Sequence, residues 1–232
     1  MAIHNHKKTV LITGTNRGVG LCMVKHYLDK GYHVIAVCRN ISDSLAQIKK
    51  TNTASLQVVD GIDITDQNSI NYLVNEIQPQ KIDILINNAG QWCNDSLNDF
   101  NLEQMLNNMK VNAFGSLAVT YALLPLINEN SKIIMMTSKM GSISDNQSGG
   151  CYGYRMSKAA LNAAAKSLSI DLKDQDISVA IIHPGWVKTD MGGPNALIDA
   201  KTSVTGIASI IEQLNIDNSG SFYNYDGQII NW

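Results

Sequence analysis

Charged residues are scarce in this sequence, and neither sign dominates. They occupy 16% of the 232 positions and leave a formal net charge of -2 at pH 7, whereas about 25% is usual for globular proteins. No run of basic residues interleaved with aromatic side chains occurs. Because nucleic-acid binding depends on Lys and Arg side chains that neutralise phosphates, we expect no nucleic-acid partner.

Cysteine is scarce as well, with four widely separated residues: Cys22, Cys38, Cys93 and Cys151. They form neither a CxxC pair nor a recognisable zinc-binding pattern. Neither a metal site nor a disulfide framework is therefore expected, and a reducing compartment is the simpler interpretation.

Long hydrophobic runs are also missing. No stretch approaches the roughly 18 apolar residues of a membrane span, and the segment Met1–Lys8, with His4 and His6, lacks the apolar core of a secretory signal. We therefore expect a soluble, cytoplasmic protein without membrane association.

The sequence does contain an alternation of strand-like and helix-like segments. Helical spacing is clear at Ile70, Leu73, Val74 and Ile77. Segments such as VLIT and VAII are apolar without alternation, as expected for strands covered by helices on both faces. The sequence predicts one α/β domain of Rossmann type over residues 1–232, with a doubly wound, parallel, seven-stranded sheet and helices on both faces. The predicted strands are Thr9–Thr13, His33–Cys38, Leu56–Val59, Ile82–Asn87, Lys132–Thr137, Ile177–Ile182 and Ser221–Tyr225.

The first predicted strand runs into a glycine-rich segment, TGTNRGVG at residues 13–20, which opens a helical segment. Glycines let the backbone approach a pyrophosphate, which is stabilised by N–H groups and by the positive end of the helix dipole. The alternative is a glycine-rich turn without a ligand, but its position at the first strand–helix junction favours a nucleotide. The candidate contacts are Gly14, Asn16, Arg17, Gly18, Val19 and Gly20.

The end of the second predicted strand distinguishes the two nicotinamide cofactors. An acid there usually holds the ribose 2′-hydroxyl of NAD, whereas an Arg accommodates the 2′-phosphate of NADP. The strand ends in VCRN, residues 37–40, without an acid. Arg39 and Arg17 are predicted to clamp the 2′-phosphate; the alternative is that both are solvated surface residues. We predict NADP(H) as the preferred cofactor and NAD(H) as the alternative.

Tyr154 is the one tyrosine among eight that is followed four residues later by a lysine, Lys158. Spacing of i, i+4 places both side chains on one face of a helix. Lowering a tyrosine pKa from about 10 toward 7 requires about 4 kcal/mol of phenolate stabilisation, part of which a neighbouring ammonium supplies. An isolated YxxxK pair would more often be an ordinary structural Tyr and a solvated Lys.

Four further motifs accompany this pair in a fixed order: TGxxxGxG at residues 13–20, NNAG at 87–90, Ser138, and Pro184-Gly185. Together with YxxxK, their order and spacing resemble the short-chain dehydrogenase/reductase family. The resemblance covers nearly the whole chain, and it favours a catalytic role for Tyr154.

The resemblance implies four catalytic residues. Tyr154 would donate a proton to the substrate carbonyl oxygen, and Ser138 would hydrogen-bond that oxygen. Lys158 would lower the pKa of Tyr154 and hold the nicotinamide ribose, and Asn112 would anchor a proton-relay water. His183 is interpreted as completing a strand. Besides the glycine turn and Arg39, the implied cofactor contacts are Asp63, Ile64, Asn88, Ala89, Gly90, Tyr154, Lys158, Pro184, Gly185, Val187 and Thr189.

Further stretches at residues 140–143, 152–158, 184–193 and 225–227, with Trp232, resemble the C-factor and sniffer-type carbonyl reductase subgroup. This resemblance implies NADPH-dependent reduction of a small-molecule ketone, aldehyde or quinone. The alternatives are a cofactor-binding signalling or redox-sensor protein of C-factor type, and an NAD(P)-dependent ketoacyl reductase or alcohol dehydrogenase.

The substrate pocket is expected to be rather open, because only residues 190–200 separate Thr189 from the next helical pattern. Lys139 would favour anionic substrates if it points inward and is otherwise a solvated lysine. Family members often form dimers or tetramers, here through helices at about Leu102–Ile127 and Tyr154–Leu172. The candidate lining residues are Trp92, Cys93, Lys139, Met140, residues 147–151, Trp186 and Met191.

Overall fold

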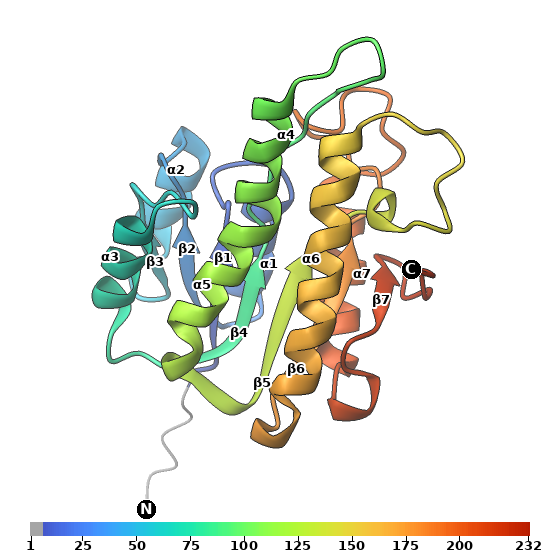
Figure 1. Cartoon of the computed structure of the whole chain (residues 1–232). Helices are drawn as coiled ribbons and strands as arrows, with labels where there is room; N and C mark the ends of the chain where they lie inside the picture. The colour runs from blue at the N-terminus through green and yellow to red at the C-terminus, as the bar shows by residue number, and fades with distance from the viewer. Residues whose placement is uncertain (1–6) are drawn as a thin grey trace, which may run out of the picture.

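In the computed structural model, which describes residues 7–232, seven strands alternate with helices along the chain (Figure 1). The segment with His4 and His6, where no secretory signal is expected, lies outside the described residues. The strands are β1 (Thr9–Thr13), β2 (His33–Val37), β3 (Leu56–Val59), β4 (Ile82–Asn87), β5 (Ile127–Met136), β6 (Ser178–His183) and β7 (Phe222–Asn224). The α-helices are α1 (Gly18–Asp29), α2 (Asp43–Thr51), α3 (Gln67–Ile77), α4 (Leu102–Met109), α5 (Ser116–Leu123), α6 (Tyr152–Asp171) and α7 (Ala200–Gln213).

All neighbouring strands of the sheet are parallel, and their order is β3-β2-β1-β4-β5-β6-β7. The predicted α/β class with a parallel seven-stranded sheet is confirmed. The strand order reverses between β1 and β4, where Val10 pairs with Val34 of β2 on one side and Ile84 of β4 on the other. In open α/β sheets, ligands bind in the crevice outside the carboxyl ends of the strands at such a reversal.

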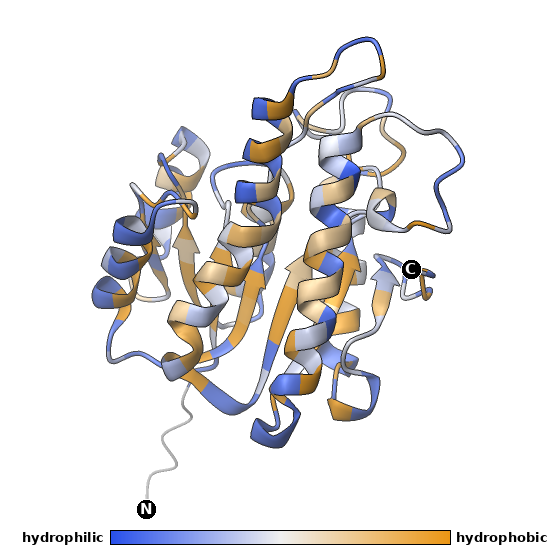
Figure 2. Cartoon of the chain, viewed as in Figure 1, coloured by the Kyte–Doolittle hydropathy of each residue, from blue (hydrophilic) through white to orange (hydrophobic). Residues whose placement is uncertain are grey.

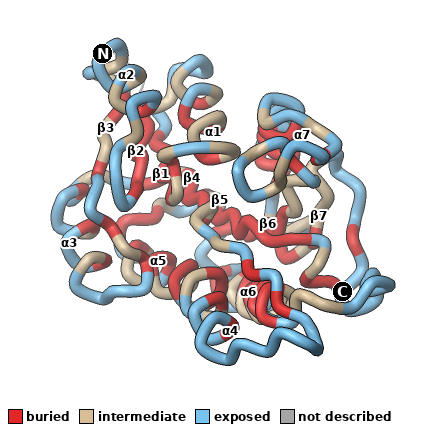
Figure 3. The backbone as a smooth tube through the Cα atoms, turned by 90° about the horizontal axis from the view of Figure 1, so that it is seen from above, coloured by how far each residue is buried: buried red, intermediate tan, exposed pale blue. Residues whose placement is uncertain are grey.

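Helices cover both faces of the sheet (Figure 3). One face packs against α3, α5 and α6 through buried residues such as Leu73 and Leu161. The other packs against α1, α2 and α7 through residues such as Met23 and Ile207. Figure 2 shows the strands as strongly hydrophobic segments between these layers. Burial on both faces explains why VLIT and VAII are apolar without alternation.

Strand β5 is longer than the sequence predicts, because it begins at Ile127 rather than Lys132. Ile127 pairs with Ile82 of β4, and the register shifts before Lys132 pairs with Ile84. The added part contains the exposed polar residues Glu129 and Asn130. Hydrophobic patterning therefore did not mark it as a strand.

The helix predicted from about Leu102 to Ile127 forms an unbroken helical run, but it is not α-helical throughout. Helix α4 passes into a π-helical segment, Lys110–Gly115, before α5, and a 3-10 turn at Leu124–Leu126 precedes β5. Short π-helical segments within helices frequently occur at functional sites, and this one contains Asn112. No helix among residues 7–232 is long and apolar enough to cross a membrane.

Candidate active site

A cavity of about 890 Å³ opens near the carboxyl ends of the strands, where the strand order reverses. Ser138, Tyr154 and Lys158 line it, whereas Asn112 does not. The sheet thus brings together motifs that are far apart in the chain. The predicted cofactor contacts that line the cavity are Gly14, Asn16, Arg17, Gly18, Val19, Gly20, Arg39, Asp63, Ile64, Asn88, Ala89, Gly90, Tyr154, Lys158, Pro184, Gly185, Val187 and Thr189.

The turn after β1 is packed too closely to accept a side chain at two of its glycines. Gly14 has φ +71°, and a Cβ there would lie 2.8 Å from the Cα of Ala89. A Cβ at Gly20 would lie 2.2 Å from the carbonyl oxygen of Gly14. Among the described residues, no side chain caps the start of α1 and no acid lies in its first turn. The free N–H groups and the positive end of the helix dipole are therefore available to a phosphate.

Asn88 joins this glycine turn to the end of β4. Its side-chain amide donates hydrogen bonds to the carbonyl oxygens of Thr13 (3.0 Å) and Gly14 (3.1 Å). The backbone N–H groups of Asn88 and Ala89 donate to Thr13 Oγ1 at 3.0 and 3.1 Å. The NNAG segment therefore fixes the conformation of the glycine turn.

The two arginines of the predicted clamp both line the cavity. Arg17 Nη1 forms an ion pair at 2.7 Å with Oδ2 of Asp190, which lies in the segment after β6, and both side chains are largely exposed. Arg39 is exposed just beyond β2 and forms no ion pair with any of residues 7–232. Because exposed ion pairs contribute at most about 1 kcal/mol, Arg17 can exchange Asp190 for a phosphate group.

Asp63 and Ile64 form the wall of the cavity beyond β3. Thr65 donates to Asp63 Oδ1 through its backbone N–H (2.9 Å) and its hydroxyl (2.7 Å). These hydrogen bonds, with a smaller effect of Arg39, lower the pKa of Asp63. Ile64 packs against Gly115, where a Cβ would lie 2.9 Å from Ile64 Cγ1. Their contact with adenine stays a prediction.

Tyr154 lies in the first turn of α6 and is buried, with its ring 4.5 Å from that of Trp92 between centroids. Burial raises the pKa of Tyr154 to about 12, and a hydrogen bond with the Ser138 side chain acts in the opposite direction. The shift is thus opposite to the lowering predicted from Lys158. Tyr154 is a neutral phenol at pH 7.

Lys158 lies one turn further along α6 and is 4% exposed. Its Nζ donates to the carbonyl oxygen of Met136 at 3.0 Å and lies 5.9 Å from the centroid of the Tyr154 ring. Burial lowers the pKa of Lys158 to about 8. The spacing places both residues on the cavity wall as predicted. However, the ammonium bonds to the end of β5, so burial dominates the pKa of Tyr154.

Asn112 lies behind the cavity wall and is fully buried. Its Nδ2 donates to Gln91 O (2.9 Å), Asn108 Oδ1 (3.1 Å) and Ser157 Oγ (3.0 Å), and its Oδ1 accepts from the Gln91 N–H (2.8 Å). These bonds tie the π-helical segment to α6 and to the chain after NNAG. The water-anchoring role stays a prediction.

The segment after β6 folds back on itself beside the cavity. Trp186 Nε1 donates to the Gly192 carbonyl oxygen at 2.7 Å, and Thr189 Oγ1 accepts from the Gly192 N–H at 3.2 Å. Val187 pairs with Ile198 in an isolated bridge. These contacts give the short segment a defined shape and keep Val187 and Thr189 on the cavity wall.

The wall around Tyr154 mixes apolar and polar side chains. Cys93 and residues 149–151, which the sequence suggested as lining, do not line the cavity; Cys93 is buried and donates to Asp95 Oδ1 at 3.3 Å. Lys139 forms a partly exposed ion pair with Asp145 at 3.0 Å, so this pair brings no net charge to the pocket. The predicted residues that do line it are Trp92, Lys139, Met140, Gln147, Ser148, Trp186 and Met191.

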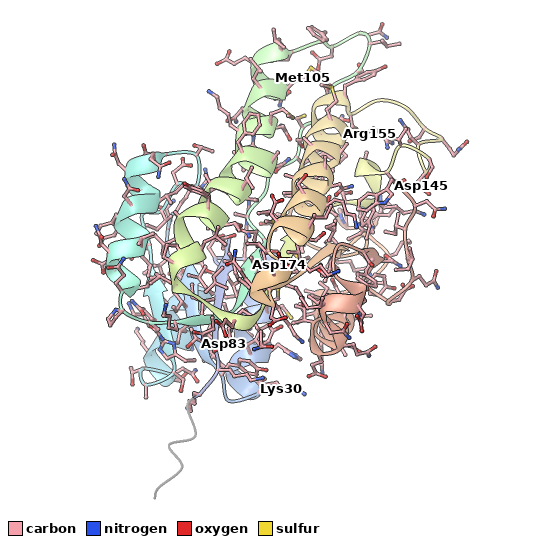
Figure 4. The ribbon with its side chains drawn as sticks, turned by 60° about the horizontal axis from the view of Figure 1, so that its bottom comes forward. Lys30, Asp83, Met105, Asp145, Arg155 and Asp174 are labelled. Carbon is pink, nitrogen blue, oxygen red and sulfur yellow. The ribbon has the colours of Figure 1, made fainter. Side chains whose placement is uncertain are left out.

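Arg155 lines the cavity although the sequence analysis did not single it out. Its guanidinium donates to Gly150 O (3.1 Å), Met140 O (3.3 Å) and Ser148 Oγ (2.8 Å), and so holds the loop before α6. Figure 4 shows Arg155 well away from Asp83 and Lys30, which lie toward the opposite end of the molecule. The sequence signal that could have identified Arg155 is its position as a cation directly after Tyr154.

Asp95 is a second residue that the sequence analysis missed. It is 2% exposed, and its carboxylate accepts from the Gly153 N–H at 3.0 Å (Oδ2) and 3.3 Å (Oδ1). Its carbonyl oxygen accepts from the Cys151 N–H at 2.8 Å. Asp95 therefore caps the helix that carries Tyr154. No sequence signal could reveal this contact, because the partners are 58 residues apart.

Comparisons with known proteins agree with this geometry. The family described as short chain dehydrogenase matches residues 8–197. C-signal of Myxococcus xanthus is 44% identical over 156 residues, covering 65% of this chain and 93% of that protein. The carbonyl reductase Sniffer of D. melanogaster superposes with a TM-score of 0.91 at 35% identity, covering 98% of this chain and 100% of that one. NADPH-bound carbonyl reductase from chicken fatty liver gives a TM-score of 0.87 at 29% identity, covering 97% and 99%.

Proposed function

This chain belongs to the short-chain dehydrogenase family, as an oxidoreductase of the class acting on C=O and CH–OH groups, and we propose that it reduces a ketone, aldehyde or quinone with NADPH. The convergence of the glycine turn, Arg39, Ser138, Tyr154 and Lys158 on one cavity carries this proposal. A fold of this kind hosts many functions, whereas these residues supply a cofactor cradle, an oxygen-binding hydroxyl and a proton donor.

The cofactor, when bound, would supply the hydride. The turn containing Gly14 and Gly20 and the uncapped start of α1 would hold its pyrophosphate. Arg39 and Arg17 would hold a 2′-phosphate, and the lack of an acid at the end of β2 favours NADP(H) over the alternative, NAD(H). The chicken carbonyl reductase, which binds NADPH, supports the same choice.

Tyr154 would deliver its phenolic proton to the substrate oxygen as that oxygen gains negative charge, and Ser138 would hydrogen-bond the same oxygen. With a pKa raised to about 12 by burial, the phenol keeps its proton at pH 7, which suits reduction. Lys158, with a pKa lowered to about 8 by burial, also keeps its proton. Its positive charge would stabilise the phenolate that remains after transfer.

A signalling role is the second candidate, and the 44% identity with C-signal favours it. A cofactor-binding sensor would not need the full set of Ser138, Tyr154 and Lys158, whereas turnover would. We therefore regard signalling as an added role rather than a replacement for catalysis. A ketoacyl reductase or an alcohol dehydrogenase would use the same residues with another substrate or direction.

The decisive experiment follows NADPH oxidation by the purified protein across a panel of ketones, aldehydes and quinones. We expect Tyr154→Phe to lower kcat by about 10²–10⁴-fold, because the proton donor is lost, with NADPH binding retained in a fluorescence titration. Tyr152→Phe is the matched control, since Tyr152 lies two residues earlier and does not line the cavity. Undiminished turnover in Tyr154→Phe would contradict the mechanism, and faster turnover with NADH would contradict the arginine clamp.

The cytoplasm is the compartment that we propose. All four cysteines are free, as is usual in reducing compartments. Cell fractionation tests this proposal, and recovery of the protein in a membrane or secreted fraction would contradict it.

A further inference from the structure

His183 lies beside the catalytic residues but has no part in the reaction proposed above. It is the last residue of β6, and the Thr137 N–H donates to the Ile182 carbonyl oxygen at 2.9 Å, so β5 and β6 stay paired up to the residue before Ser138. Ser138 and His183 therefore lie at adjacent strand ends. Both line the cavity.

The Nδ1 atom of His183 is buried and has no hydrogen-bond partner among residues 7–232. Burial lowers the pKa of His183 to about 4, with a further contribution from Lys139, so the ring is neutral at pH 7. Buried polar groups in proteins are nearly always hydrogen-bonded. Because the unpaired Nδ1 is enclosed by protein, a ligand in the cavity can reach only the other ring nitrogen, Nε2.

The surroundings of the ring decide which nitrogen carries the proton. A neutral imidazole has one N–H donor and one acceptor nitrogen. A proton on Nδ1 would be a buried donor without an acceptor, which is unfavourable. Protonation of Nε2 avoids this and makes that nitrogen the donor. A neutral donor of this kind suits a carbonyl or hydroxyl oxygen, and the Lys139–Asp145 pair adds no net charge nearby.

We propose that His183 donates a hydrogen bond to a second oxygen of the substrate and thereby selects carbonyl compounds with an oxygen on the neighbouring carbon over simple ketones. The proposal rests on the proposed reductase function. Neighbouring strands lie about 4.8 Å apart. A ring at the end of β6 can therefore reach an atom one or two bonds from a carbonyl held by Ser138 at the end of β5. His183 is thus a specificity-determining residue.

The test compares 1-phenyl-1,2-propanedione with propiophenone, which lacks the second oxygen, in the wild-type protein and in two variants. His183→Leu removes the donor, whereas His183→Gln keeps an amide N–H near the position of Nε2. We expect His183→Leu to lower kcat/KM for the dione about tenfold, through KM, and for the ketone by less than about threefold. His183→Gln should recover most of the dione activity.

Equal losses on both substrates would overturn the proposal, because they would show that the ring only supports the fold. If wild type reduces neither compound although NADPH binds, the reductase assignment fails separately. The role of His183 is then read from binding of the dione, followed by the fluorescence of Trp92 and Trp186 in the cavity wall. Affinity about tenfold weaker in His183→Leu than in wild type supports the proposal, and equal affinity overturns it.

Discussion

At the scale of one residue, the buried ammonium of Lys158 destabilises the fold but serves the proposed reaction. Its ammonium is almost fully enclosed and bonds to the Met136 carbonyl oxygen at 3.0 Å. Among the described residues it forms no ion pair with a carboxylate. Burying a charge without a counter-charge is costly, and the pKa lowered to about 8 expresses that cost. The same charge is what a developing phenolate at Tyr154 requires.

This cost predicts how stability depends on pH. Burial lowers the pKa of Lys158 to about 8 in the folded protein, from an ordinary value of 10.5. Between these values the unfolded chain binds more protons, so the free energy of unfolding rises with pH in this window. At pH 7 we expect the free energy of unfolding of Lys158→Met to exceed that of wild type by on the order of 2–3 kcal/mol. This difference between the two proteins should narrow from about pH 8 to pH 10. Urea unfolding at each pH measures both.

The matched control is Lys166→Met, an exposed lysine on the same helix. The difference in free energy of unfolding between Lys166→Met and wild type should stay constant from pH 7 to pH 10. Stability curves for wild type and Lys158→Met that run parallel from pH 7 to pH 10 would show that burial does not perturb Lys158.

The start of α6 carries the catalytic geometry at the scale of an element. Its N-cap residue, Cys151, has φ 49° and makes no side-chain capping bond. The buried carboxylate of Asp95, which comes from the loop before α4, accepts from the Gly153 N–H instead. Because Tyr154 follows directly, Asp95 is a positioning residue for the phenol.

We expect Asp95→Ala to lower kcat about tenfold and the free energy of unfolding by about 1–3 kcal/mol, because a buried N–H at the start of α6 loses its acceptor. NADPH affinity should stay unchanged, since the glycine turn lies on other elements. Steady-state kinetics, cofactor titration and urea unfolding provide the three readouts.

Asp95→Asn removes the negative charge but keeps the cap, because the Oδ1 of an asparagine can still accept a hydrogen bond from the Gly153 N–H. This variant should restore most of kcat. If Asn and Ala variants lose kcat equally, or if NADPH affinity falls with kcat, Asp95 does not act by positioning Tyr154.

The whole molecule exposes apolar side chains outside the cavity. Leu102, Leu106, Phe114 and Tyr121, all more than half exposed, lie along α4, the π-helical segment and α5. Such a series on one side of a protein commonly marks an interaction site. It supports the homodimer or homotetramer that the family resemblance implies.

We therefore expect the wild-type protein to be an oligomer in solution and a Leu106→Glu, Tyr121→Glu double variant to be a monomer, because charges on this surface oppose its burial. Light scattering coupled to size-exclusion chromatography measures the mass. Ile143→Glu, on an exposed loop after β5, is the control and should leave the mass unchanged. A monomeric wild type would contradict the prediction.

Local sequence patterns are enough to predict the parallel α/β sheet, the glycine turn and the placement of Tyr154 and Lys158 on one helix face. These follow from local spacing: continuous apolar segments, glycines at a strand–helix junction, and residues one helical turn apart. The sequence did not predict the full length of β5, because polar residues such as Glu129 give no strand signal. Arg39 was predicted as a cofactor contact from its place at a strand end, and the structure places it in the cavity wall.

Three features follow from the folded structure alone: the raised pKa of Tyr154, the position of Asn112 behind the cavity wall, and the exclusion of Cys93 from the pocket. The folded structure also revealed Asp95 at the start of α6 and the unpaired Nδ1 of His183. Each depends on burial or on hydrogen bonds between distant segments. Because packing sets desolvation and brings such partners together, no pattern of neighbouring residues can encode them locally.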